Sequence, residues 1–191
     1  ADVSIDGGTT GLIMGLSTID GALTLLGGGT ITDTGIATVA GTLSATTDAS
    51  NKAITLDQLA VDGAFTLAPD GTGAVTIVND AGLNLAASTM GGTFSGTATT
   101  GDISDSGNLA ITAAATFITA ANGSNIILDQ SGNAFSAAVT VKAGTGGGGT
   151  FGNITFVDSA AVKLHSSAGA NGDLFIDGST DLAVGGTLAI T

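Results

Sequence analysis

The sequence predicts an all-β fold: a single-stranded β-solenoid of the right-handed parallel β-helix type, with coils of about 20 residues. Three observations lead to this fold class. The chain repeats itself at a long and nearly constant offset of about 72 residues, its apolar residues occur in short runs with a period of two, and its composition suits strands and turns rather than helices.

The internal repeat is clearest in residues 103–130, which align without a gap with residues 31–58 at an offset of 72. A biased composition produces chance matches, but it does not hold one offset through several motifs in order. We therefore interpret the offset as a structural superrepeat. The nine identical pairs are Ile31/Ile103, Asp33/Asp105, Gly35/Gly107, Thr47/Thr119, Ala49/Ala121, Ile54/Ile126, Leu56/Leu128, Asp57/Asp129 and Gln58/Gln130.

The repeat continues on both sides of this segment. Residues 82–94 match residues 11–23 at an offset of 71, and residues 134–138 match residues 64–68 at an offset of 70. We attribute these small slips in the offset to the turns. The predicted organisation is one continuous solenoid segment over residues 1–191, taken from a longer chain, with superrepeats at about 11–81, 82–154 and, in part, 155–191.

The superrepeat decides between two all-β architectures. Asp-Gly and Asn-Gly pairs are typical of hairpins, and hence of an antiparallel sandwich or barrel. In a sandwich every strand has its own neighbours, so nothing favours a repeated series of strands. In a solenoid each coil stacks on a near copy of itself, and equivalent residues form ladders along the axis. A superrepeat of this length would hold roughly three or four coils.

The strands are predicted from short runs in which apolar residues alternate with Thr, Asn, Lys or Asp. Alternation places Val, Ile, Leu and an occasional Phe in a narrow core and Thr on the outer face. Right-handed winding follows from the crossover rule for parallel strands. We expect strands, in order, at residues 22–26, 53–56, 64–68, 74–78, 83–87, 125–128, 139–143, 154–158, 161–165 and 173–177.

Composition and charge exclude several kinds of partner. The chain is 43% hydrophobic, which argues against disorder. Its net charge is −13, all 16 acidic residues are Asp, and besides His165 the only cations are Lys52, Lys142 and Lys163. Nucleic acids and anionic membrane surfaces both require a basic patch. The sequence therefore predicts no nucleic-acid partner and no membrane insertion.

Two phrases carry a family resemblance. Residues 78–111, VNDAGLNLAASTMGGTFSGTATTGDISDSGNLAI, and residues 124–144, SNIILDQSGNAFSAAVTVKAG, resemble the repeat regions of very large secreted bacterial adhesins of the filamentous haemagglutinin type. Met90 and Gln130 depart from the usual phrase of that family. The resemblance implies a right-handed parallel β-helix, export to the cell surface, and roles in adhesion, biofilm or matrix.

Catalysis needs groups that this sequence hardly supplies. Polysaccharide lyases need a base and cations, and sugar-binding sites usually use aromatic platforms, but Arg, Tyr and Trp are absent. Glycoside hydrolysis needs only paired carboxylates. The candidates are close pairs in sequence, and Asp is also the usual residue of turns. We predict no enzyme and no catalytic, cofactor-binding or metal-binding residues; the candidates for paired carboxylates are Asp102, Asp105, Asp173, Asp177 and Asp181.

Several other motifs indicate surface features. His165 is expected to face solvent, and residues 144–150, GTGGGGT, to form a flexible loop that lacks the Lys of a phosphate-binding loop. Residues 27–35, GGGTITDTG, lack the spacing of a calcium-binding nonapeptide, which leaves open only weak Ca²⁺ binding by rows of Asp. Ice binding needs Thr-x-Thr in every coil, and residues 97–99 are the clear instance. N-glycosylation sequons occur at Asn122 and Asn153.

The sequence favours a structural, adhesive rod segment of a giant secreted cell-surface protein, serving cell attachment, biofilm or matrix. A self-assembling extracellular filament subunit is the alternative hypothesis, and a polysaccharide-acting β-helix enzyme is a third. Expected partners are neighbouring solenoid segments of the same protein, end to end or side by side, and host or cell-surface glycans or proteins. The expected location is extracellular, at the cell surface.

Overall fold

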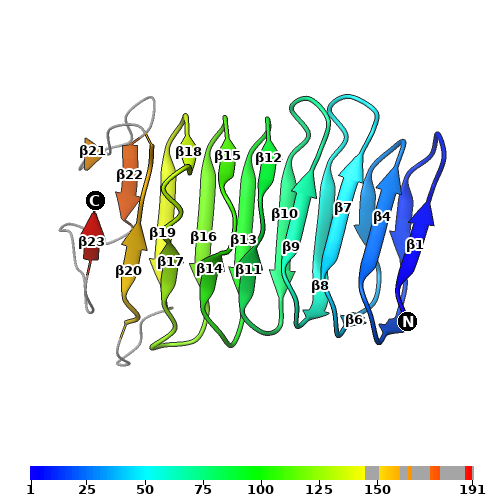
Figure 1. The fold of residues 1–191 in the computed structure, drawn as a ribbon, viewed down its shortest axis with the longest axis horizontal. Coiled ribbons are helices and arrows are strands. Elements are labelled where there is room, and N and C mark those ends of the chain that lie inside the picture. The colour runs from blue at the N-terminus through cyan, green and yellow to red at the C-terminus, as the bar shows by residue number, and fades with distance from the viewer. Residues whose placement is uncertain (145–150, 160–162, 165–172, 177–187, 191) are drawn as a thin grey trace.

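A computed structural model describes residues 1–144, 151–159, 163–164, 173–176 and 188–190. Within these residues the regular structure is entirely β-strand, and the paired strands run parallel. The strands stack one beside the next along the long axis, from the N-terminus to the C-terminus (Figure 1). The predicted parallel solenoid is confirmed, and the antiparallel alternative is wrong.

Two long sheets form the walls of the solenoid. Among the described residues sheet 1 has nine strands and sheet 2 has eleven, two of them outside its main order. Sheet 1 runs β1 (Val3–Asp6), β4 (Leu23–Gly27), β7 (Leu43–Thr47), β9 (Phe65–Ala68), β11 (Leu83–Leu85), β14 (Ile103–Asp105), β17 (Ile126–Leu128), β20 (Ile154–Phe156) and β23 (Leu188–Ile190). The main order of sheet 2 is β2 (Leu12–Met14), β5 (Ile31–Asp33), β8 (Ile54–Val61), β10 (Val75–Asn79), β13 (Phe94–Ala98), β16 (Ala115–Thr119), β19 (Val139–Ala143), β22 (Asp173–Ile176) and β21 (Lys163–Leu164).

Short strands between the two walls complete the coils. In the first coils β3 (Ser17–Ile19) pairs with β6 (Ala37–Val39), and β6 pairs with the second half of β8. In later coils a separate sheet 3 joins β12 (Ser88–Met90), β15 (Leu109–Ile111) and β18 (Ala134–Phe135). In the early coils the chain enters a short strand after its strand of sheet 2, and in the later coils it enters the short strand before its strand of sheet 2. The order in which the chain visits the three sheets therefore changes along the rod.

The coil length follows from the register of sheet 1. Leu23 pairs with Leu43 in the next coil, and Leu43 pairs with Phe65 in the coil after that. The predicted coil of about 20 residues is confirmed for this regular part of the rod. The coil that separates the paired residues Ile126 and Ile154 is longer. At about 4.8 Å between strands, the nine strands of sheet 1 make a rod of roughly 40 Å.

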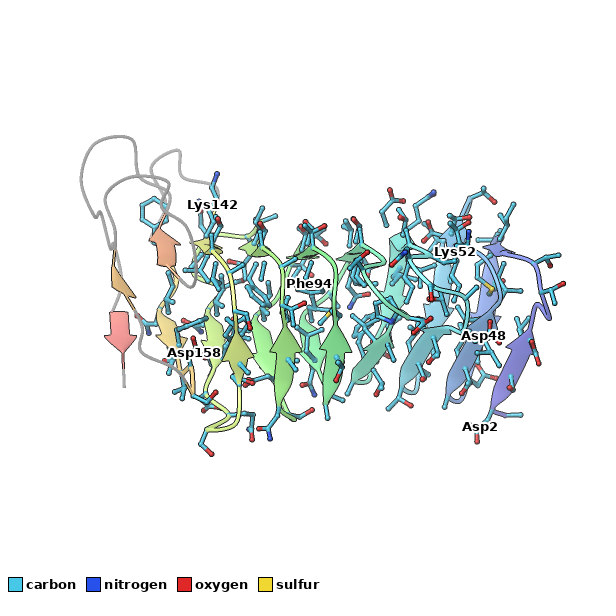
Figure 2. The ribbon with its side chains drawn as sticks, turned by 90° about the horizontal axis from the view of Figure 1, so that it is seen from above. Asp2, Asp48, Lys52, Phe94, Lys142 and Asp158 are labelled. Carbon is cyan, nitrogen blue, oxygen red and sulfur yellow. The ribbon has the colours of Figure 1, made fainter. Side chains whose placement is uncertain are left out.

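A single apolar core runs the length of the solenoid. The inward residues of the strands are Val, Ile, Leu, Ala and Phe, and most are less than 3% exposed. In the second half of the rod, Phe94, Phe117, Phe135 and Phe156 form a column, with neighbouring ring centroids 4.9 to 6.0 Å apart. Figure 2 shows Phe94 between the layers. Gly96 makes room for the column, since a Cβ there would lie 2.7 Å from the ring of Phe94.

The superrepeat is not a whole number of coils. At the offset of the superrepeat, β2, β4, β5 and β7 correspond to β11, β13, β14 and β16. β2 and β5 lie in sheet 2 but β11 and β14 lie in sheet 1, whereas β4 and β7 lie in sheet 1 but β13 and β16 lie in sheet 2. One superrepeat therefore covers three and a half coils. Equivalent residues of the two copies lie in opposite walls of the solenoid.

This half coil places equivalent residues of the two copies in separate ladders. The predicted ladders form between successive coils: Ile31 stacks on Ile54 in sheet 2, whereas Ile103 stacks on Ile126 in sheet 1. The stacking of one coil on the next requires apolar residues of similar size, and it does not require that they be equivalent in the superrepeat. The sequence match between residues 64–68 and 134–138, at an offset of 70, does not reflect structural equivalence. A strand of sheet 1 in the first copy corresponds to a strand of sheet 2 in the second, but β9 lies in sheet 1 and β18 lies in sheet 3.

Candidate functional site

A row of hydroxyl groups covers the outer face of sheet 2. The row has one Thr or Ser in each of six successive strands, and each side chain is half-buried by its neighbours. This confirms the predicted outer position of Thr. The residues, in register, are Thr32, Thr55, Thr76, Ser95, Thr116 and Thr140.

The row is not the regular double array that ice binding needs. Farther along the same strands, the adjacent outer row contains Val78, Thr97, Ile118 and Lys142 in register. Aliphatic, hydroxyl and charged side chains are mixed in this second row, and none of these four strands contains Thr-x-Thr, because Thr97 follows Ser95 and Thr99 lies beyond the end of its strand. The face is a flat, almost uncharged surface beside strongly acidic turns.

Two repeated aspartates fasten one coil to the next. Asp33 accepts hydrogen bonds from the backbone N–H groups of Asp57 (3.2 Å) and Gln58 (2.8 Å). Asp105 makes the equivalent contacts with Asp129 (3.0 Å) and Gln130 (3.5 Å) in the second copy. Burial raises the pKa of both Asp33 and Asp105, while the backbone hydrogen bonds act in the opposite direction. We call these two sites the aspartate clamps.

Two repeated threonines provide a second fastening. The buried hydroxyl of Thr47 accepts a hydrogen bond from the backbone N–H of Asp70 at 3.0 Å and donates to the Lys52 carbonyl at 3.4 Å. The buried hydroxyl of Thr119 accepts from the N–H of Gly144 at 3.0 Å and donates to the Ser124 carbonyl at 3.3 Å. These threonine clamps occupy the same position of the superrepeat, but they lie in opposite sheets.

Buried amides form a third set of internal contacts, which the sequence did not indicate. Asn79 is fully buried, accepts from the N–H of Val61 at 2.8 Å and donates to its carbonyl at 2.9 Å. Asn133 is also fully buried, accepts from the N–H of Leu109 at 2.8 Å and donates to Asp105 at 2.6 Å. Both amides are satisfied by the protein itself, so neither is free to hold a ligand.

Two of the five carboxylates considered for catalysis, Asp102 and Asp105, have separate structural roles. Asp102 is exposed, and it accepts hydrogen bonds from the backbone N–H (2.7 Å) and side-chain amide (3.2 Å) of Asn125. Asp105 is only 7% exposed and belongs to an aspartate clamp. The expectation that it is a turn residue was wrong: it ends strand β14 and points inward beside Asn133.

Other predicted features lie partly outside the described residues. His165, Asp177 and Asp181 are not among them, nor are residues 145–150 of the glycine-rich loop, and of Asp173 only the backbone is described. In the part of the chain that the structure describes, there is no group of three or more His or Asp side chains that could hold a metal ion. No helix long and apolar enough to span a membrane occurs in that same part.

One polar groove crosses several coils. It has a volume of about 670 Å³ and follows the turns that lead into β9, β11, β14 and β17. One residue of its lining, Asn84, has a side-chain oxygen, Oδ1, that is buried beneath the groove without a hydrogen-bond partner among the described residues. Nothing in the sequence indicated this groove, because its residues come from four separate turns. Its polar side chains include Asp62, Asn84, Thr100, Asp102, Ser104 and Asn122.

Comparison with known protein families identifies the repeat. Residues 1–68 and 72–142 each match a family described as repeats of unknown function (DUF5649). The chain belongs to this family. The start points of the two DUF5649 repeats agree with the offset of 71 found within the sequence. No curated protein and no solved structure gave a significant match to the chain.

The DUF5649 repeat corresponds to a definite structural unit. The first match contains β1 to β9, with four strands of sheet 1 and three of the main order of sheet 2. The second begins with β10 and ends within β19, and it has three strands of sheet 1 and four of sheet 2. Each DUF5649 repeat therefore supplies seven long-wall strands, and its neighbour supplies the same seven with the walls exchanged.

Proposed function

We propose that this chain is a rod segment of a large secreted cell-surface protein and acts as a rigid spacer in attachment, biofilm or matrix. One observation carries the proposal. Among the nine identical pairs of residues 31–58 and 103–130, the side chains whose contacts are defined either fill the core or fasten one coil to the next. Repetition of this chain thus preserves the connection between coils, which is what a spacer requires.

The spacing of charge supports the same role. The chain has a net charge of −13, and among the described residues most Asp lie in turns or at strand ends, which leaves the long walls almost uncharged. Like charges along a rod repel each other and keep separate rods apart in solution. The rod's stiffness comes from parallel hydrogen bonds between neighbouring coils, which a flexible linker lacks.

A filament subunit is the second candidate, favoured by a different observation. Three large aliphatic side chains are exposed close together in the first two coils: Ile13 (71%), Leu16 (83%) and Ile36 (51%). Leu16 and Ile36 lie in neighbouring coils, next to the paired residues Ser17 and Ala37. Exposed apolar clusters of this kind commonly mark contact sites between proteins.

Length measurements on tandem chains test the spacer proposal. One, two and three copies of the chain would be placed in series and imaged by electron microscopy. A rigid spacer predicts isolated rods whose length grows in proportion to copy number, by roughly 40 Å per copy. Growth with the square root of copy number, as for a flexible linker, would refute it. Fibres many times longer than the tandem chain would favour the filament. Antibodies that fail to label intact cells producing the protein would refute the surface location.

A further inference from the structure

The groove before β9, β11, β14 and β17 has the shape of an elongated binding site. Its lining comes from residues 61–63, 81–84, 100–104 and 122–124, which belong to four successive coils. With about 4.8 Å between coils, the groove extends roughly 15 Å along the rod axis. It therefore fits a narrow, extended molecule lying parallel to the axis rather than a compact one.

The floor of the groove is largely backbone. Each of the four turns places a glycine in the lining: Gly63, Gly82, Gly101 and Gly123. At Gly101 a Cβ would lie 2.7 Å from the backbone nitrogen of Gly82, so successive turns approach more closely than other residues allow. A ligand in the groove thus lies against peptide groups, with polar side chains at its sides.

The polar groups in the groove differ in how far the protein already uses them. Asp102 is engaged by Asn125, and the hydroxyl of Thr100 donates to the carbonyl of Asp80 at 2.6 Å. Among the described residues, Oδ1 of Asn84 has no partner, and no hydrogen bond holds the exposed carboxylate of Asp62. A buried polar atom without a partner is rare in folded proteins and needs an explanation. No hydrogen bond among the described residues holds the side chain of Asn84, so rotation of that side chain would bring its buried Oδ1 to a ligand in the groove.

The free groups define the chemistry of the ligand. The free atoms of Asn84 and Asp62 accept hydrogen bonds, whereas the hydroxyl of Ser104 and the amide of Asn122, also in the lining, can both donate and accept, so a matching ligand carries donors and acceptors together. The lysines with described side chains, Lys52 and Lys142, are not in the lining, so nothing there would neutralise a phosphate, sulfate or uronate. A metal ion is disfavoured because the groove has two carboxylates, of which Asp102 is already engaged. The lining offers no aromatic or broad apolar surface for a hydrophobic ligand, and a sugar in it would be held by hydrogen bonds without the aromatic platform that sugar-binding sites usually have.

We propose that this groove binds an uncharged oligosaccharide, with sugar hydroxyl groups donating hydrogen bonds to Asn84 and Asp62. Hydroxyl groups supply donors without negative charge, and an extended sugar chain matches a groove that runs along the axis. The site does not depend on the spacer role, since a rod of any function would carry it. The groove joins the two copies, and its Asn84 acceptor is specific to the second, because at the offset of 71 the position of Asn84 is occupied by Ile13 in the first copy.

The sequence itself supplies a matched pair of variants. Asn84→Ile introduces the residue found at the equivalent position of the first copy and removes the unpaired acceptor. Asn108→Ile makes the same chemical change outside the groove, at an exposed residue whose first-copy equivalent is Ile36. Both variants are expected to fold, which thermal unfolding of each would verify.

The test uses the full chain labelled with ¹⁵N and titrated with neutral hexamers of glucose, mannose and N-acetylglucosamine. We expect at least one hexamer to shift the amide resonances of Asp62 and Asn84 saturably. Asn84→Ile should weaken this binding at least tenfold, and Asn108→Ile should leave it unchanged. Asn84→Ile should leave the rod length in electron micrographs unchanged. Loss of sugar binding without a change in rod length would show that the binding site and the spacer role are independent.

Three outcomes would overturn the proposal. One is the absence of any saturable shift with the three neutral hexamers at millimolar concentration. Another is equal affinity of the original chain and Asn84→Ile. The third is a shift of the same resonances by polygalacturonate or by calcium chloride when the neutral hexamers cause none, because the groove would then recognise charge.

Discussion

The threonine clamps allow a sharp test, because the same residue occupies the same position of both copies but in different surroundings. In the first copy the N–H of Asp70 has the hydroxyl of Thr47 as its acceptor. In the second copy the N–H of Gly144 has two acceptors, the hydroxyl of Thr119 at 3.0 Å and the carbonyl of the same residue at 2.9 Å. Replacing Thr by Val keeps the shape and removes the hydroxyl.

The two substitutions should therefore differ in cost. Thr47→Val leaves a partly buried N–H without an acceptor, which costs about 2 kcal/mol of unfolding free energy. Thr119→Val leaves the N–H of Gly144 its carbonyl acceptor, so we expect about 1 kcal/mol or less. In both variants the lost donation to a carbonyl is long, at 3.4 and 3.3 Å, and adds little to the difference.

Urea unfolding followed by circular dichroism measures both costs. Thr116→Val, on the outer hydroxyl row, is the control and should change the unfolding free energy by less than about 0.5 kcal/mol. If Thr119→Val destabilises the chain as much as Thr47→Val, the reasoning from acceptor number is refuted. Hydrogen exchange adds a local readout, since the amide of Asp70 should lose protection in Thr47→Val.

Three further predictions concern the core and the charges. Phe117→Ala removes a fully buried ring from the phenylalanine column and should cost about 3 to 5 kcal/mol in urea unfolding, whereas Phe151→Ala at an exposed ring should cost little. Gly96→Ala should destabilise by about 1 to 3 kcal/mol, because its Cβ would meet the ring of Phe94; a neutral effect would show that the column repacks freely. Burial raises the pKa of Asp105 above its ordinary value of 3.8, so this carboxyl group binds a proton more tightly in the folded chain than in the unfolded chain. The unfolding free energy should therefore rise as the pH falls from above the folded-state pKa toward 3.8. Urea titrations across this range should show a weaker pH dependence in Asp105→Asn than in the control Asp48→Asn.

Much of the fold could be predicted because the physical signals are local. Alternation in runs such as residues 139–143 fixes which side chains face inward, and the structure has a strand there with the expected burial. Phe is the largest residue available for a narrow core, and Phe65, Phe94 and Phe117 are buried as expected. The coil length followed from strand and turn lengths.

The relation between superrepeat and coil could not be predicted. Single coils differ in length, since the coil between Ile126 and Ile154 is longer than the one between Leu23 and Leu43, so an offset of 72 does not distinguish three coils from three and a half. The choice depends on turn lengths, and a small slip in a turn leaves the alternation unchanged.

Inward polar residues were missed for a related reason. Asn79 and Asp105 occupy inward positions of their strands, where alternation predicts apolar side chains. Apart from the nearby carbonyl of Gly82, which accepts from Asn79, their hydrogen-bond partners are 18 or more residues away, so the local sequence does not mark them as buried.

The groove was missed because it has no contiguous sequence. Its two free acceptors, Asp62 and Asn84, are separated by a whole coil, and each resembles an ordinary surface residue when the sequence is read alone. The substitution of Ile13 by Asn84 between copies was the only visible trace, and such differences are common between repeats. Stacking brings these residues together.

The half coil in each repeat gives copy number a geometric meaning. Losing or gaining a single repeat by recombination would turn everything that follows through half a revolution, so that a downstream module would emerge on the reverse side of the cell-surface rod we propose. Losing or gaining two repeats would shorten or lengthen the rod and leave every downstream module facing its original direction. Odd and even changes in repeat number are therefore unequal events, and proteins built from this unit are expected to vary preferentially in pairs.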